Sequence, residues 1–84
     1  MRYSIEFVPS AKRALAKLPL EIRQRIRVAI DRLADSPFPP GASKLQAEPG
    51  YRIRVGDYRI VYDVEHQRLT VLVIRIGHRR EVYR

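Results

Sequence analysis

The chain has 84 residues, 45% of them hydrophobic and 31% charged, which is typical of one small globular domain, expected here over residues 1–84. It contains no cysteine, which excludes disulfides and thiolate metal sites, and its longest apolar run, residues 71–74, is too short to span a membrane. The formal net charge of +8 favours a polyanionic partner, either a nucleic acid or an acidic protein.

The N-terminal part of the chain predicts one strand followed by two helices. Residues 2–9 alternate polar and apolar side chains up to a proline, which predicts a strand, argues against a signal peptide and favours a cytoplasmic protein. Ser10 is the expected N-cap of a short helix over residues 11–18. After Pro19 a second, amphipathic helix is expected. Its apolar residues are Ile22, Ile26, Ala29, Ile30 and Leu33.

The remainder of the chain predicts a loop and then an antiparallel sheet. Residues 36–50 hold four of the six prolines and two of the four glycines, so we expect a long loop with a functional or packing role. Three β-rich runs follow, at residues 51–55, 58–64 and 69–77. The predicted fold class is α+β: an N-terminal strand, a two-helix hairpin, and an antiparallel β-meander with the helices packed on one sheet face.

Gly56 and Asp57 lie between two alternating runs and predict a two-residue hairpin turn, which places Arg54 opposite Arg59. Since side chains alternate along a strand, the hairpin has two faces. The face for the helices to cover carries Tyr51, Ile53, Val55, Tyr58, Ile60, Tyr62 and Val64. The other face carries Arg52, Arg54, Arg59, Val61 and Asp63. Like charges directly opposite one another are destabilising by up to about 1 kcal/mol, so the gathering of arginines calls for an explanation.

This arginine-rich face favours a built anion site, because a face that only had to be solvated would normally mix charges of both signs. Two alternatives stay open: the arginines splay into water, or Asp63 and another acid neutralise them. The face that Arg75 takes is also open, because the length of the connection at residues 65–68 is ambiguous and a one-residue slip reverses every side chain.

The chemistry that suits these residues is metal-independent cleavage of RNA. From Tyr51 onward the chain has eight arginines and no lysine, and a guanidinium holds phosphate oxygens bidentately. His66 and His78, without cysteine or a paired acidic motif, do not make a metal site, so no cofactor is expected. Preorganised arginines stabilise the negative charge that develops when a 2′-hydroxyl attacks the adjacent phosphate.

The predicted order of elements, with "YRIRVGDYRIVYDV" at residues 51–64 and "IRIGHRREVY" at residues 74–83, resembles the RelE branch of the RelE/ParE toxin superfamily over essentially the whole chain. The resemblance implies the toxin of a type II toxin–antitoxin system that cuts messenger RNA in the ribosomal A site. It also implies a cognate RelB-like antitoxin. The net charge predicts that this antitoxin is acidic or partly disordered, wraps the domain and covers the basic face. A hetero-oligomer of toxin and antitoxin is therefore expected.

Carried onto this sequence, the resemblance implies a set of catalytic residues. Arg59 would stabilise the transition state, Arg79 would act beside it, and Tyr83 would stack on or orient the nucleotide. Arg52 and Arg54 stand where the best-known members have lysines credited with phosphate binding and proton transfer. Arginine keeps its proton at physiological pH, so neither residue is a comfortable general base.

His78 is a candidate general base, because neighbouring arginines favour its neutral form; the alternative is a histidine that hydrogen-bonds at a strand end. The expected phosphate ligands are Arg52, Arg54, Arg75 and Arg80. Two other functions stay open: a ParE-type toxin that inhibits DNA gyrase without nuclease activity, and a catalytically inactive module that binds RNA or the ribosome. The joint presence of Arg59, Arg79 and Tyr83 favours the nuclease.

Overall fold

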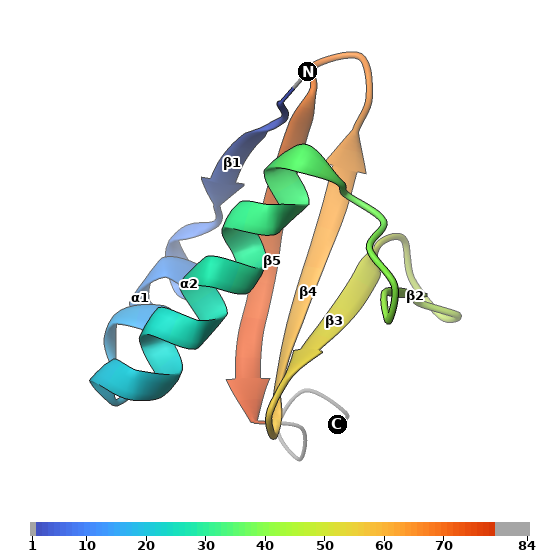
Figure 1. The fold of residues 1–84 in the computed structure, drawn as a ribbon. Helices are drawn as coiled ribbons and strands as arrows, with labels where there is room; N and C mark the ends of the chain where they lie inside the picture. The colour runs from blue at the N-terminus through green and yellow to red at the C-terminus, as the bar shows by residue number, and fades with distance from the viewer. Residues whose placement is uncertain (1, 79–84) are drawn as a thin grey trace.

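The computed structural model describes residues 2–78. Its elements are β1 (Ser4–Phe7), α1 (Pro9–Ala16), α2 (Leu20–Asp35), β2 (Ser43–Lys44), β3 (Tyr51–Val55), β4 (Tyr58–Glu65) and β5 (Thr70–His78). The strands form one sheet in the order β1-β5-β4-β3-β2 (Figure 1). The predicted α+β class is confirmed.

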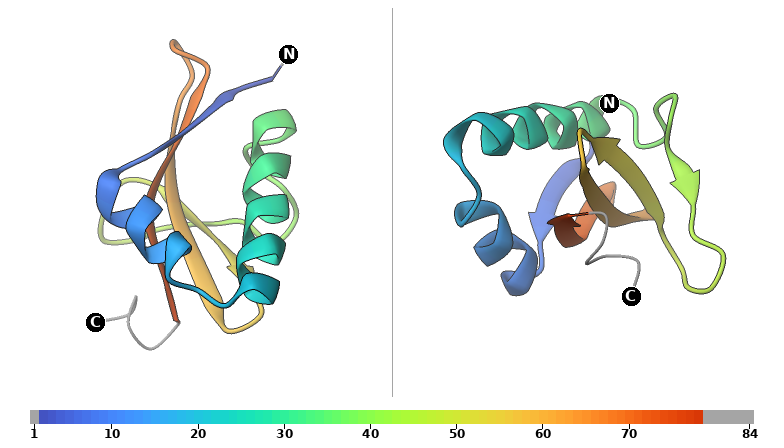
Figure 2. Two further views of the ribbon diagram at one scale, coloured as in Figure 1. Left: turned by 90° about the vertical axis from the view of Figure 1, so that its left-hand side faces the viewer. Right: turned by 90° about the horizontal axis from the view of Figure 1, so that it is seen from below.

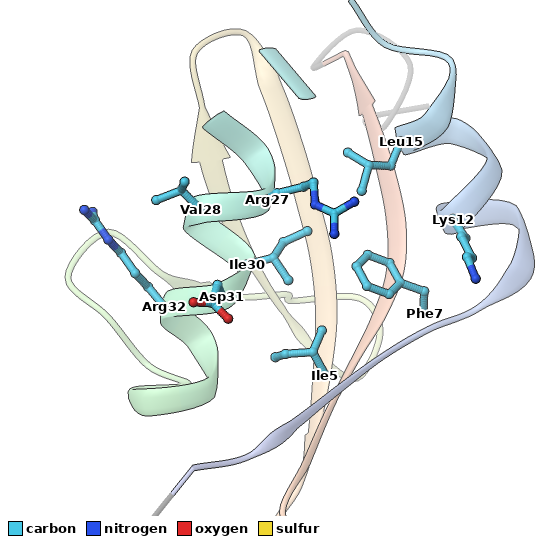
Figure 3. Close-up of a pocket in the computed structure, with 9 residues that line it drawn as sticks. All are labelled: Ile5, Phe7, Lys12, Leu15, Arg27, Val28, Ile30, Asp31 and Arg32. Carbon is cyan, nitrogen blue, oxygen red and sulfur yellow. The ribbon is translucent and has the colours of Figure 1, made fainter. Parts of the chain in front are cut away.

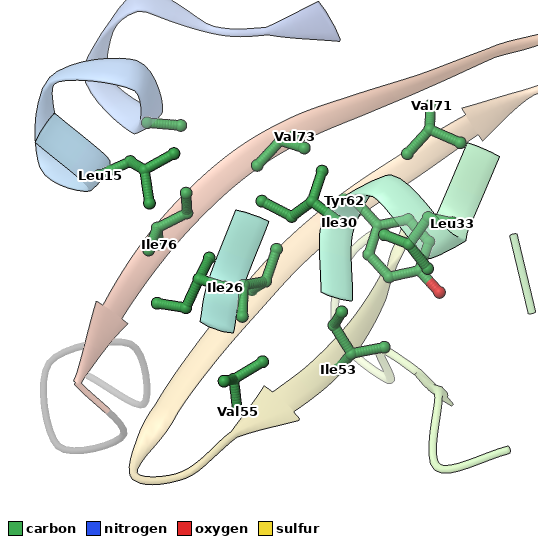
Figure 4. Close-up of a cluster of buried hydrophobic side chains, with 12 residues drawn as sticks. Leu15, Ile26, Ile30, Leu33, Ile53, Val55, Tyr62, Val71, Val73 and Ile76 are labelled. Carbon is green, nitrogen blue, oxygen red and sulfur yellow. The ribbon is translucent and has the colours of Figure 1, made fainter. Parts of the chain in front are cut away.

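The two helices cover the sheet from one side, as predicted. α2 lies across the sheet, whereas α1 lies near its β1 edge, and the turn between them contains Pro19, the N-cap of α2 (Figure 2). Apolar side chains from both helices meet those of β3, β4 and β5 in one buried cluster (Figure 4). All seven hairpin residues expected to face the helices belong to this cluster or pack against it. No helix within residues 2–78 is long and apolar enough to cross a membrane.

The predicted register of the hairpin is confirmed residue by residue. Val55 pairs with Tyr58 and Arg54 with Arg59 across the turn, and the pairing continues to Tyr51 with Tyr62. β5 pairs antiparallel with β4, which completes the meander. β1 adds to the far side of β5 in parallel orientation, so the sheet is mixed rather than purely antiparallel.

A β-bulge in β5 decides which face Arg75 takes. Tyr62 pairs with Val73 and Val61 pairs with Arg75, so Ile74 is an extra residue on the β5 side. Without this extra residue, Arg75 would continue the alternation of Val73 and point into the core, where an unpaired charge is costly. The bulge reverses the alternation and puts Arg75 on the side of the sheet away from the helices.

One expectation about local structure is wrong and another is incomplete. The first helix begins at Pro9 rather than after Ser10, its N-cap is Val8, and no side chain caps it. Proline is favoured in a first helical turn because the N–H it lacks would have no partner there. The expected loop at residues 36–50 contains the strand β2, which pairs with β3. A strand of two residues is too short to show an alternating pattern.

Tyr62 ties the long connection after α2 to the sheet. Its side chain is fully buried, and its hydroxyl donates a hydrogen bond of 2.7 Å to the carbonyl oxygen of Pro37. Burial, with a smaller contribution from Tyr51, raises the pKa of Tyr62 to about 12. The neutral phenol is therefore the form that the folded state stabilises.

Tyr62→Phe is expected to lower the free energy of unfolding near neutral pH by about 0.5–1.5 kcal/mol, because it removes this hydrogen bond. The raised pKa of Tyr62 means that its contribution is present below the ordinary value of 10.0 and is lost as the pH rises through about 12. Urea denaturation of the variant should therefore show a smaller loss of stability over that alkaline range than the wild type. Tyr3→Phe is the control, because Tyr3 is only partly buried. Equal alkaline losses in Tyr62→Phe and wild type would contradict the prediction.

Candidate functional site

The side of the sheet away from the helices carries what we call the arginine face, which consists of Arg52, Arg54, Arg59, Val61 and Arg75. It is built from two rows that cross three strands. In one row Arg59 lies between Arg54 and Gly77, and in the other Val61 lies between Arg52 and Arg75. Side chains directly opposite one another in such pairs have Cβ atoms about 4.5–5.5 Å apart. Four guanidinium groups thus come from a small patch of sheet.

Arg59 is the buried member of the arginine face, with an exposed fraction of 3%. Arg59 pairs with Gly77 on the neighbouring strand β5. Because Gly77 has no side chain, the long side chain of Arg59 has room over the sheet. Val61, with 2% exposed, forms the apolar floor of the second row. A buried cation at the edge of a groove can stabilise negative charge that develops on a bound ligand.

Arg59 borders two hollows. A groove of about 580 Å³ is lined by residues 43–48 together with Arg52, Arg59, Val61 and Arg75. A smaller polar hollow of about 160 Å³ lies at the hairpin end and is lined by residues 56–59 and Arg54. Both hollows are bordered by guanidinium groups, which suits phosphate oxygens.

The groove contains an acidic residue that the sequence analysis missed. Glu48, the one acidic residue in the segment 36–50, accepts a hydrogen bond from Arg75 through its carboxylate and forms an ion pair with it. Asp63, the acid that we had considered, accepts a hydrogen bond of 2.9 Å from the backbone N–H of Val64. Glu48 is 27 residues away from Arg75 in the chain, so no local sequence pattern joins them.

The structure brings together four of the predicted site residues, Arg52, Arg54, Arg59 and Arg75. It does not bring His78 to them. His78 pairs with Tyr58 at the end of β5, on the helix side of the sheet, and the two rings meet edge to face with centroids 5.7 Å apart. His78 thus lies on the other side of the sheet from the four arginines, and its role as general base stays a prediction.

The other predicted site residues, Arg79, Arg80 and Tyr83, lie outside the described residues. Within residues 2–78 no three histidine, aspartate or glutamate side chains are grouped so that they could hold a metal ion.

A larger groove, of about 680 Å³, lies on the helix side between α1, α2 and β1. Its floor is apolar, and Figure 3 shows Arg27 reaching across it from α2. Phe7 and Leu15 line it, but none of the four arginines of the arginine face does. The concentration of guanidinium groups therefore singles out the smaller groove as the candidate anion site.

The chain matches the family model described as the ParE toxin of the type II toxin–antitoxin system parDE over residues 5–83. It is 31% identical to the toxin RelG of Mycobacterium tuberculosis, over 100% of this chain and 99% of that protein. The chain belongs to the RelE/ParE toxin superfamily. The family predicted from residues 51–64 and 74–83 is thereby confirmed.

Other members of the RelE/ParE superfamily show the same likeness. The mRNA interferase toxin RelE of Escherichia coli K12 is 31% identical, with 99% of this chain and 92% of that protein covered. Among solved structures, the toxin–antitoxin complex RelBE2 from Mycobacterium tuberculosis matches with a TM-score of 0.80 and 30% identity, covering 93% of this chain and 99% of that chain. The fold is thus that of RelE-type toxins.

Gly50→Ala tests how residues 43–48 are held over the groove. The loop is closed by a hydrogen bond of 2.9 Å from the N–H of Leu45 to the carbonyl oxygen of Gly50. Gly50 has a φ of +116°, and a Cβ there would lie 2.9 Å from the carbonyl oxygen of Tyr62. We expect the substitution to cost about 1–3 kcal/mol in the free energy of unfolding.

Gly41→Ala is the matched control for that substitution. Gly41 also has a positive φ, +92°, but a Cβ there would have nothing within 4 Å. Chemical denaturation should therefore show a larger loss for Gly50→Ala than for Gly41→Ala. Equal losses would mean that backbone strain alone, and not contact with β4, determines the cost.

Proposed function

We propose that this toxin is a metal-independent endoribonuclease that cuts messenger RNA in the A site of translating ribosomes and so inhibits translation in the cytoplasm. The observation that carries the proposal is the buried Arg59, which borders two guanidinium-lined hollows on one face of the sheet. The relative from Escherichia coli is named an mRNA interferase, which supports the same substrate class.

In the proposed reaction the 2′-hydroxyl of one nucleotide gives up its proton to water and its oxygen attacks the adjacent phosphorus. The bond from phosphorus to the 5′-oxygen of the next nucleotide breaks, and that oxygen takes up a proton from water. The products are a 2′,3′-cyclic phosphate and a free 5′-hydroxyl. Arg59 stabilises the extra negative charge on the five-coordinate phosphorus. Arg79 acts beside it and assists the leaving oxygen, and Tyr83 stacks on or orients the nucleotide.

The remaining arginines hold the RNA strand. Arg52, Arg54, Arg75 and Arg80 contact the phosphates on either side of the cut, where bidentate guanidinium contacts fix the strand without reading its sequence. None of these arginines readily accepts a proton. The isolated toxin is therefore expected to be a weak catalyst that depends on the ribosome to position its substrate.

We further propose that an acidic antitoxin of the RelB type restrains the toxin. The net charge of +8 favours such a partner. The matching structures from Mycobacterium tuberculosis and Escherichia coli are toxin–antitoxin complexes, which supports the same arrangement. A toxin–antitoxin hetero-oligomer that covers the arginine face would keep RNA out of the groove.

A second candidate function is supported by the family model, which is described for ParE toxins. A ParE-type toxin would inhibit DNA gyrase by binding and would leave messenger RNA intact. The four gathered arginines, with Arg59 buried among them, favour the nuclease over this alternative, since a buried cation beside a groove suits the stabilisation of a developing charge.

The decisive experiment adds the toxin to a translating extract and maps the 5′ ends of the message by primer extension. We expect new cuts only on translated message. Arg59→Gln should lower the cleavage rate by about 10²–10³, because it removes a donor aimed at the transition state. Arg79→Ala and Tyr83→Phe should also lose the cuts.

Arg68→Gln is the matched control for Arg59→Gln. Arg68 is exposed in the turn between β4 and β5, at the other end of the strands, where it pairs with Glu6 and Glu65. It should cut at the wild-type rate, and circular dichroism should show that both variants are folded. Arrested growth with intact message and relaxed or broken DNA would instead assign the protein to the gyrase inhibitors.

A further inference from the structure

The ion pair between Glu48 and Arg75 lies inside the groove and is only half buried. The exposed side-chain fractions are 48% for Arg75 and 51% for Glu48. Glu48 belongs to the wall formed by residues 43–48, whereas Arg75 stands on the sheet in the row with Val61 and Arg52. The pair therefore joins the wall of the groove to its floor.

The carboxylate of Glu48 takes up donor positions that a phosphate would need. A guanidinium binds carboxylate and phosphate oxygens through the same planar N–H groups, so the two anions compete for Arg75. A half-exposed ion pair of this kind is weak and can be exchanged, with a contribution that corresponds to no more than about fivefold in an equilibrium constant.

We propose that Glu48 is an exchangeable latch on the RNA groove, displaced from Arg75 by a phosphate of the bound strand. The inference rests on the proposed function, because it takes RNA as the ligand. Arg59 and Arg52 stand in the same groove and contact neighbouring phosphates of the strand.

Opening the latch costs a single anion and a strand the same free energy, but the strand has more contacts to offset that cost. A lone phosphate or mononucleotide at Arg75 has to displace Glu48 with the energy of one contact. A strand makes several phosphate contacts at once, so the cost of opening one weak pair is spread over all of them. Glu48 thus lowers the affinity for both ligands by the same factor, and the strand, which binds through more contacts, still occupies the site.

The test measures binding of a short, fluorescently labelled single-stranded RNA whose 2′-hydroxyls are all methylated, so that it cannot be cleaved. Glu48→Gln keeps the shape of the side chain but removes the charge that holds Arg75. We expect it to bind this RNA about two- to fivefold more tightly than the wild type. It should tighten inorganic phosphate binding by a similar factor.

Glu65→Gln is the matched control, because it changes the net charge by the same amount. Glu65 is also in an ion pair, with Arg68 at 3.3 Å, and has a comparable exposed fraction of 45%. It lies at the other end of β4 from the hairpin turn. Any general effect of added positive charge will appear in this variant, so the gain of Glu48→Gln over Glu65→Gln isolates the latch.

Arg75→Gln completes a double-mutant cycle. Alone it should weaken RNA binding and reduce the slope of log K against log salt by about 0.7, the value for one phosphate contact on a single strand. In the Arg75→Gln background, Glu48→Gln should have no effect beyond that of the control. Thermal unfolding should show that all variants are folded, since both side chains are half exposed.

Two results would overturn the latch and leave the nuclease intact: equal RNA affinities for Glu48→Gln and Glu65→Gln, or a full Glu48→Gln effect without Arg75. A wild-type protein that neither binds the methylated RNA nor cuts translated message would overturn both proposals together.

Discussion

The two-residue turn at Gly56–Asp57 determines which residues of β3 and β4 pair with each other, and most of the molecule depends on this register. Gly56 has a φ of +58°, a conformation that suits glycine, and the pairing that follows puts Ile53 opposite Ile60 on the helix side. A slip of one residue would expose the core of the hairpin. Each buried aliphatic side chain contributes about 1.5–3 kcal/mol, so the register is strongly held.

This register also forces Arg54 and Arg59 to face each other. The repulsion of a directly opposed like-charged pair is at most about 1 kcal/mol, well below the free energy gained on the other side of the same two strands. The core therefore stabilises an arrangement of charge that would not form by itself. The free energy of unfolding of a small domain is low, so a pair of like charges that lowers it further is a reason to regard the arginine face as functional.

The bulge at Ile74 has a comparable consequence on β5. The strand has to bury Val71 and Val73 at one end and Ile76 at the other, and an even alternation cannot do so. The extra residue satisfies both ends and turns Arg75 outward at the same time. Core packing and the fourth arginine of the arginine face are thus two results of one local irregularity.

The two sides of the sheet differ in function: one packs the core and the other carries the candidate site. The helix side contains the buried cluster, and its larger groove is bordered mainly by apolar side chains. The opposite side has the guanidinium groups and, over them, the segment with Glu48. That segment is tied to the core at two points. The hydroxyl of Tyr62 donates a hydrogen bond to the carbonyl oxygen of Pro37, and Gly50 lies close to the backbone of β4. The wall of the groove is therefore positioned by the packing on the far side of the sheet.

The sequence by itself determined the order of elements other than β2, the hairpin register and the three arginines on the first two strands of the meander. These follow from alternation and from a turn with a strong local signal, and both act over a few residues. The starting point of α1 was misjudged because Ser10 resembles a cap, while Pro9 fits the first turn equally well.

Only the tertiary structure decided the positions of Arg75, His78 and Glu48. The face of Arg75 depends on a bulge that forms because β5 has to match both β4 and the helices. That same bulge sends His78 to the helix side, beside Tyr58. Glu48 meets Arg75 through a loop whose path is set by β2 and Gly50. Contacts between residues so far apart in the chain arise from packing, which leaves no periodic trace in the sequence.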